Sequence, residues 1–291
     1  MDTSISINRD LCKKCLTCTE ICPNVIFIRD QEAAEIRQER VNLCIKCGQC
    51  MAACRDKAIQ ISGLDYERDF FDLPEIINSF DALIQTRRSI RAFKDKPVPA
   101  DILEQIATAA SFAPPSFPPH KTEITIIKDK ETVRKSLPYM VDLYENLMKR
   151  MKKPVQRFFI ERIAGEEQYK LLRNHIVPMF SVKMPFMKAG TEDAITRNAQ
   201  ALMLFHSDGR SENYNTDIFI ALTYALLKAH TLGIGATVND LIPHAVDKSP
   251  ELRKMFKIPT RNVVVASLVL GYPKYRYRRG IKRQFKSVTW I

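Results

Sequence analysis

The chain has 291 residues, of which 45% are hydrophobic and 27% are charged. These are ordinary values for a globular protein, so they exclude wholesale disorder, and the 9 glycines show no collagen-like repeat. The net charge is +12 at pH 7, and the surplus lies after residue 62, because residues 1–62 hold 9 basic and 8 acidic side chains. A basic part of this size favours anionic ligands, such as phosphates or nucleic acid.

No apolar run approaches the ~18 residues that a membrane span needs. The first residues, MDTSISINRDLCKKC, lack the apolar core of a signal peptide. We therefore expect a cytoplasmic protein without a membrane partner.

Eight cysteines lie between residues 12 and 54 in two runs of identical spacing, C-x2-C-x2-C-x3-C. The first run comprises Cys12, Cys15, Cys18 and Cys22, and the second comprises Cys44, Cys47, Cys50 and Cys54. Pro23 follows the first run, which then matches the two-cluster ferredoxins of bacteria, whereas Arg55 follows the second. The repeat of 32 residues predicts two 4Fe–4S clusters.

In this pattern the first three thiolates of a run hold one cubane, and the fourth cysteine binds the cluster of the other run. One cluster is therefore expected on Cys12, Cys15, Cys18 and Cys54. The other is expected on Cys22, Cys44, Cys47 and Cys50. Zinc or disulfides are the alternatives, but a third cysteine at the same step is unusual for zinc, and disulfides are typical of secreted domains.

Short apolar segments flank the two runs and predict strands at residues 5–7, 25–28 and 59–61. With the cysteines they outline a ferredoxin-type domain of residues 1–62. This domain has no room for a substrate pocket, so its chemistry is one-electron transfer. Residues 63–71 are expected to be a linker, and residues 72–291 a second domain that spends or receives the electrons.

The second domain begins with a helical pattern, in which Asp72 and Glu75 fit an N-terminal capping box and apolar residues continue to Ile84. Helices are expected at 101–112, 131–175 with breaks at Pro138 and Pro154, 214–232 and 249–256. Strands are expected at 123–128, 201–206 and 262–270. Helices around one central sheet predict an α+β sandwich with an antiparallel or mixed sheet.

Residues 86–93, TRRSIRAF, place three arginines and a serine directly after the first helix of this domain. A guanidinium binds phosphate with a fork of N–H donors, and a serine hydroxyl adds another donor. Alone, such a loop is more often a solvated basic surface. A Pro-rich loop APPS, a helix ending LGIGATVND and a strand ending VLGYP follow it in order.

This arrangement resembles the FMN-dependent nitroreductase family over residues 72–285, and the whole chain resembles ferredoxin–nitroreductase fusions of anaerobes. The resemblance implies that FMN is held through its phosphate, ribityl chain and pyrimidine edge by Arg87, Arg88, Ser89 and Arg91. Arg278, with Arg276 and Arg279 as alternatives, would close on the phosphate. It also implies a homodimer, with each FMN at the dimer interface.

Two further segments are implied by the same resemblance. Pro114, Pro115 and Ser116 would lie under the flavin ring. Val238, Asn239 and Asp240 would turn a backbone amide toward flavin N5. Members of the family often have Asn and Gln after the APS loop, where this chain has Pro118 and His120, so His120 is a candidate ring contact.

These features predict an iron–sulfur flavoprotein oxidoreductase in which electrons pass from a donor through two clusters to FMN and a flat, electron-poor acceptor. Nitroaromatics, quinones and conjugated metabolites fit that description, and an acidic ferredoxin or flavodoxin could be the donor. The alternative is a redox sensor or electron carrier without catalysis, whose basic part, including residues 274–286, binds a partner or nucleic acid. No nucleotide-binding glycine motif or histidine metal spacing is present.

Overall fold

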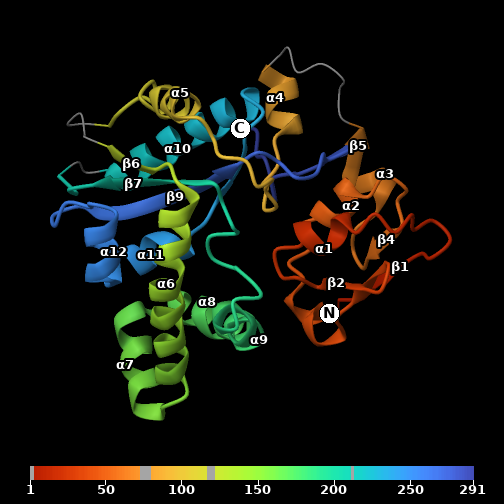
Figure 1. The fold of residues 1–291 in the computed structure, drawn as a ribbon, viewed down its shortest axis with the longest axis horizontal. Coiled ribbons are helices and arrows are strands. Elements are labelled where there is room, and N and C mark those ends of the chain that lie inside the picture. The colour runs from red at the N-terminus through yellow and green to blue at the C-terminus, as the bar shows by residue number, and fades with distance from the viewer. Residues whose placement is uncertain (1–2, 73–79, 117–121, 211–212) are drawn as a thin grey trace. The chain divides into compact units, whose positions relative to one another are not determined.

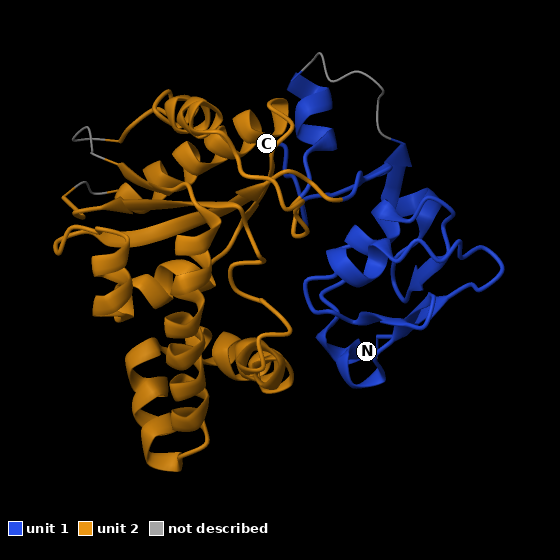
Figure 2. Ribbon diagram, in the orientation of Figure 1, with its two compact units in different colours: residues 1–88, 275–291 blue, residues 89–274 orange. Residues whose placement is uncertain are grey.

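The computed structural model describes residues 3–72, 80–116, 122–210 and 213–291. They form two compact units, one of residues 1–88 with 275–291 and the other of residues 89–274 (Figure 2). The C-terminal segment therefore belongs with the cysteine-containing unit. The sequence-based domain bounds at 62 and 72 stay a prediction, because compactness does not show which part folds alone.

Unit 1 is built from short elements (Figure 1). Its strands are β1 (Ile5–Ile7), β2 (Phe27–Asp30), β3 (Ala33–Ile36), β4 (Ile59–Ile61), β5 (Phe70–Asp72) and β10 (Arg279–Ile281). Its helices are α1 (Thr17–Ile21), the 3-10 helix η1 (Gln38–Leu43), α2 (Gln49–Ala53), α3 (Tyr66–Asp69) and α4 (Phe80–Thr86). The strands pair antiparallel as β1 with β4, β2 with β3 and β5 with β10.

The segment predicted to be a linker carries α3 and β5. Asp65 caps α3 by accepting hydrogen bonds from the backbone amides of Glu67 and Arg68. The predicted capping box at Asp72 and Glu75 runs into residues 73–79, which lie outside the described residues.

Unit 2 contains a four-stranded antiparallel sheet in the order β6-β7-β9-β8. The strands are β6 (Glu123–Ile127), β7 (Ala201–Ser207), β8 (Gly235–Val238) and β9 (Val263–Gly271). The helices are α5 (Ala100–Ala110), α6 (Lys130–Met151), α7 (Pro154–Ala164), α8 (Glu166–Leu171), the π-helix η2 (Leu172–Ile176), α9 (Val177–Lys188), α10 (Tyr214–Thr231), α11 (Leu241–Lys248) and α12 (Pro250–Met255). This arrangement confirms the predicted α+β class.

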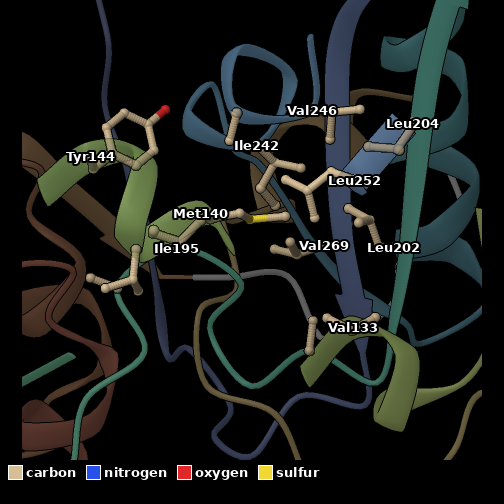
Figure 3. Packing of buried hydrophobic residues seen from close by; sticks show 14 of the residues in the cluster. Val133, Met140, Tyr144, Ile195, Leu202, Leu204, Ile242, Val246, Leu252 and Val269 are labelled. Carbon is tan, nitrogen blue, oxygen red and sulfur yellow. The ribbon is translucent and has the colours of Figure 1, made fainter. Parts of the chain in front are cut away.

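Helices cover both faces of this sheet, with α5 and α10 on one side and α11 and α12 on the other (Figure 1). Alternate side chains of β7 therefore enter different cores, because a strand points successive residues to opposite faces. Met203 and Phe205 pack with α5 and α10, whereas Leu202 and Leu204 pack with α6 and α11. Figure 3 shows the core on the side of α6 and α11, which contains Leu202 and Leu204. Burial on both sides explains why β7 reads as a continuous apolar run.

One predicted helix break is wrong. Helix α6 continues through Pro138 from Lys130 to Met151, although proline removes one helical hydrogen bond. Buried Val133, Met140 and Tyr144 lie on both sides of the proline, so packing holds the helix together. The break at Pro154 is confirmed, since α7 begins there. In the described parts of the chain, no helix has the length and apolarity to cross a membrane.

Candidate functional site

The cysteines of unit 1 form two groups of four, and each group draws on both runs. Electrostatic interactions link Cys18 with Cys12, Cys15 and Cys54. They also link Cys50 with Cys22, Cys44 and Cys47. These are the two sets expected from the exchange of the fourth ligand. None of the eight cysteines forms a disulfide, and no group of His, Cys, Asp or Glu side chains in the described residues is arranged to hold a single metal ion.

The backbone around the cysteines repeats with the sequence. Lys14, Leu16 and Val25 have positive φ, and so do their counterparts Lys46, Gly48 and Lys57. Leu16 and Gly48 directly precede α1 and α2. The left-handed backbone conformation is costly for leucine and easy for glycine. The first cysteine loop therefore keeps this shape against the conformational preference of Leu16. Two loops of one strained shape are suited to wrap two identical inorganic groups.

Gly48 is required for a second reason. A Cβ atom there would lie 3.2 Å from the Phe70 ring and 3.6 Å from Ile281. The second cysteine loop is thus packed against β5 and β10. The cavity at this loop is lined by Cys22, Cys44, Cys47 and Cys50 together with apolar side chains such as Ile26 and Phe27.

The thiols are poorly suited to ionise without a metal. Burial, reinforced by the neighbouring cysteines, raises the pKa of Cys18 to about 12. Burial also raises the pKa of Cys50 well above its usual value. Iron would supply the positive charge that makes these thiolates stable. Amides of Ile26 and Ala58 already donate to the sulfurs of Cys22 and Cys54, at 3.5 and 3.3 Å.

The arginine-and-serine motif spans the division between the units: Arg87 and Arg88 close unit 1, and Ser89 opens unit 2. In unit 2, Ser89 forms a parallel bridge with Ala236, and the Ile90 amide donates to the Ala236 carbonyl at 3.1 Å. A Cβ on Gly235 would lie only 2.6 Å from the Ile90 side chain. Gly235, the second glycine of LGIG, is therefore needed to bring Ser89 and Ile90 against β8.

In unit 1, a hollow of about 600 Å³ is lined by four cations, Arg87, Arg88, Lys282 and Arg283, with Phe71, Ile84, Gln85, Ile281 and Gln284. The lining contains no carboxylate among the described residues. Nε and Nη2 of Arg88 are buried and have no hydrogen-bond partner there. Burial, together with Arg87 and Arg283, lowers the pKa of Arg88 to about 10. A half-buried guanidinium among like charges, with two buried nitrogens left without a partner, calls for an anion, and a phosphate fits this donor set.

The proline loop is anchored within unit 2. The Ser116 amide and hydroxyl donate to the buried carboxylate of Asp217 at 3.0 and 2.7 Å. Pro114 and Pro115 are exposed beside it. His120 and Pro118 lie outside the described residues. Asp217 was not singled out from the sequence, where an acidic residue in the first turn of a helix reads as a response to the helix dipole.

Val238 is the last residue of β8, and Asn239 and Asp240 connect this strand to α11. The Asn239 side chain is structural, since its amide donates to the Ile195 carbonyl at 2.5 Å and its oxygen accepts from the Leu241 amide at 2.9 Å. The Val238 and Asp240 side chains are exposed. Arg91 is half-buried and donates weakly, at 3.4 Å, to the Ser89 carbonyl.

The C-terminal basic residues have different positions. Arg276 and Arg278 are exposed, and the Arg278 amide donates to the Ala52 carbonyl in unit 1. The Arg279 guanidinium donates to the carbonyls of Cys54 and Arg55. It is Lys282 and Arg283 that line the hollow with Arg87 and Arg88. These two were missed because a run of basic residues gives no sign of which one turns toward a site.

Residues 84–272 match the model of the nitroreductase family. The chain belongs to the nitroreductase family. Residues 11–59 match the 4Fe-4S dicluster domain, so the two parts follow in the predicted order. Family membership and this domain together make the chain an FMN-dependent oxidoreductase that contains 4Fe–4S clusters.

The similar proteins are distant in sequence. A nitroreductase with bound FMN from Desulfitobacterium hafniense is 19% identical, with 74% of this chain and 100% of that chain covered and a TM-score of 0.51. An FMN-dependent nitroreductase from Clostridium difficile is 14% identical, with 73% and 99% covered and a TM-score of 0.51. A Methanothermobacter thermautotrophicus protein provisionally named NADH dehydrogenase/NAD(P)H nitroreductase is 22% identical over 194 residues, 65% of this chain and 75% of its own.

Proposed function

We propose that this enzyme passes electrons from a reduced donor through two 4Fe–4S clusters to FMN and on to a flat, electron-poor small molecule. The observation that carries the proposal is the cationic hollow of unit 1, in which buried nitrogens of Arg88 have no partner. FMN brings both a dianionic phosphate and a ring that accepts electrons singly or in pairs. The cationic hollow and the two groups of four cysteines belong to the same unit. This supports the delivery of electrons from the clusters to the flavin ring.

Arg87, Arg88 and Arg283 are assigned to the phosphate, because the pKa of Arg88 is lowered first by burial and then by the other two charges. Arg278 remains a prediction for the same role. Ser89 and Arg91 are assigned to the ribityl chain and pyrimidine edge. A guanidinium near N1 would stabilise the negative charge that reduction places there.

Other residues are assigned to position the flavin ring. Ser116, held by Asp217, together with Pro114 and Pro115, presents an apolar support. Asn239 fixes the segment of Val238 and Asp240 through its bonds to Ile195 and Leu241. We assign the backbone of this segment, rather than a side chain, to flavin N5, and His120 to the ring edge.

The eight cysteines are assigned as cluster ligands: Cys12, Cys15, Cys18 and Cys54 for one cluster, and Cys22, Cys44, Cys47 and Cys50 for the other. The proposed acceptors are nitroaromatics, quinones or conjugated metabolites, and the proposed donor is an acidic ferredoxin or flavodoxin. A homodimer is part of the proposal, since Phe219 and Tyr224 on α10 and Phe285 and Trp290 near the C-terminus are exposed apolar residues that a second copy could cover.

The test uses anaerobically purified protein. We expect about eight irons and one FMN per chain by iron assay and visible absorption. Replacing Cys22 or Cys54 with alanine removes a ligand from a different cluster in each variant, so donor-fed turnover should be lost while FMN stays bound. Ser6→Ala, at an exposed position of β1, is the control and should behave as wild type.

The same material separates the enzyme from the non-catalytic alternative. Protein that holds iron, refuses added FMN and binds DNA in a salt-sensitive manner would show that the basic part is a nucleic-acid surface. Loss of FMN from both cysteine variants would contradict the separate roles of clusters and flavin.

A further inference from the structure

Arg279 occupies an unusual place in unit 1. Its side chain is only 12% exposed, and the ion pair that the structure records for it is long, since an oxygen of the 96% exposed Asp72 side chain lies 4.0 Å from Nε. Its Nη1 donates to the Cys54 carbonyl at 2.5 Å and its Nη2 to the Arg55 carbonyl at 2.9 Å. The charge is thus buried against the backbone of a cysteine that we assign as a cluster ligand.

The position of the guanidinium is fixed from several sides. Arg279 belongs to β10, where it pairs with Asp72 of β5. Its guanidinium lies 5.5 Å from the centre of the Tyr66 ring, and Tyr66 in turn interacts electrostatically with Cys54 and Cys50. The next residue, Gly280, admits no side chain, because a Cβ there would lie 1.9 Å from Phe71. Strand pairing and close packing hold the backbone of β10, and the Tyr66 ring lies beside the guanidinium.

Arg279 donates to two neutral carbonyls, and its recorded ion pair is a long one with an exposed carboxylate, so most of its positive charge acts on its surroundings. A 4Fe–4S cluster becomes more negative by one when it is reduced, so a fixed cation beside a ligand favours the reduced form. Arg55 offers the comparison within the chain. It also neighbours Cys54, but its side chain is 72% exposed and paired with Asp56, so water screens its charge.

We propose that Arg279 is a positioning residue that aims the Cys54 segment at its cluster and raises the reduction potential of that cluster. The proposal rests on the ligand sets of the proposed function. The C-terminal segment then contributes to electron transfer through the clusters, in addition to lining the cationic hollow. The second cluster, on Cys22, Cys44, Cys47 and Cys50, lacks such a contact with Arg279 and serves as an internal reference.

The test is a redox titration followed by electron paramagnetic resonance on anaerobic holoprotein. In Arg279→Gln, one of the two cluster waves should move, and the ratio of reduced to oxidised cluster at fixed potential should fall on the order of tenfold, which is about 59 mV for one electron. The wave that moves should be the one that Cys54→Ala eliminates or alters. In Arg55→Gln, the ratio should change less than about twofold, since exposed charges are screened.

Arg279→Lys keeps the charge but loses the fork. It should restore most of the potential, because the charge rather than the shape sets it. If the lysine variant keeps the potential but, like Arg279→Gln, loses about four of eight irons, the positioning role of the fork is supported directly. Equal small shifts in Arg279→Gln and Arg55→Gln, with iron and FMN intact in both, would overturn the inference and leave the proposed function standing. Wild-type protein without iron would instead overturn the proposed function.

Discussion

Replacing Arg88 with glutamine should change protein stability and flavin affinity in opposite directions. The pKa of Arg88 falls from 12.5 to about 10, first because of burial and then because of Arg87 and Arg283. At full strength this corresponds to ~3 kcal/mol of destabilisation at pH 7. Solvent screening of a partly exposed side chain reduces it to ~1–2 kcal/mol. The penalty is present in full at pH 7, because that lies far below the lowered pKa, so the FMN-free variant should be the more stable protein.

The affinity for FMN should fall in the same variant. Two buried nitrogens of Arg88 are available to the phosphate, and a hydrogen bond to a charged group contributes ~1.5–3 kcal/mol. Loss of both predicts FMN binding weaker by about 100-fold or more, since ~1.4 kcal/mol corresponds to tenfold.

Flavin fluorescence quenching measures the affinity. Thermal unfolding with and without FMN measures both effects, because a ligand stabilises the folded protein by an amount that grows with the logarithm of its concentration relative to Kd. Arg134→Gln, which removes an exposed charge, is the control and should leave both unchanged. An Arg88→Gln protein that binds FMN as wild type does, or that is less stable than wild type without FMN, would refute the assignment of the hollow.

The remaining predictions concern packing. Gly235→Ala places a Cβ 2.6 Å from Ile90, so we expect a loss of ~1–3 kcal/mol of stability and weaker FMN binding in fluorescence titration; wild-type affinity would show that the motif does not need β8. Deleting residues 275–291 removes β10 and Arg279 and should lower iron content and abolish high-affinity FMN binding, whereas deleting 285–291 should leave iron content intact. Full iron occupancy in the longer deletion would show that the segment is dispensable for the clusters.

The sequence predicted most accurately where chemistry imposes spacing. The two cysteine runs give the cluster loops, and the structure repeats the positive-φ residues, the helices and the amide-to-sulfur bonds at the same interval of 32 residues. Long apolar segments were equally informative, because helix α10 and strands β7 and β9 form where the sequence predicts them and are largely buried.

The sequence could not predict that the C-terminal segment 275–291 packs with the cysteine-containing unit. Strand β10 has only three residues, and its partner β5 lies about 200 residues earlier in the sequence. Neither hydrophobic periodicity nor turn residues therefore predict the pairing. Helix α9 was missed because Pro178 and Pro185 suggest breaks, although the first lies in its first turn, where proline is tolerated. Short elements held by tertiary contacts carry little local signal.

The C-terminal segment shows how two arginines with similar sequence surroundings acquire different tasks. Arg279 has both terminal nitrogens bonded to carbonyls, so binding a phosphate would require it to abandon Cys54. Arg283 lies with Arg87 and Arg88 in a hollow whose described lining has no carboxylate, so an anion there relieves repulsion without breaking any bond that the structure records for Arg283. The bonds from Nη1 and Nη2 of Arg279 to two carbonyls therefore support a structural and electrostatic role beside Cys54, although its buried Nε has no hydrogen-bond partner. The unpartnered buried nitrogens of Arg88, next to Arg283 in the hollow, support an anionic ligand there. Only three residues, 280–282, separate the two arginines, so one short segment of unit 1 carries both the proposed contact with the cluster and the proposed contact with the phosphate.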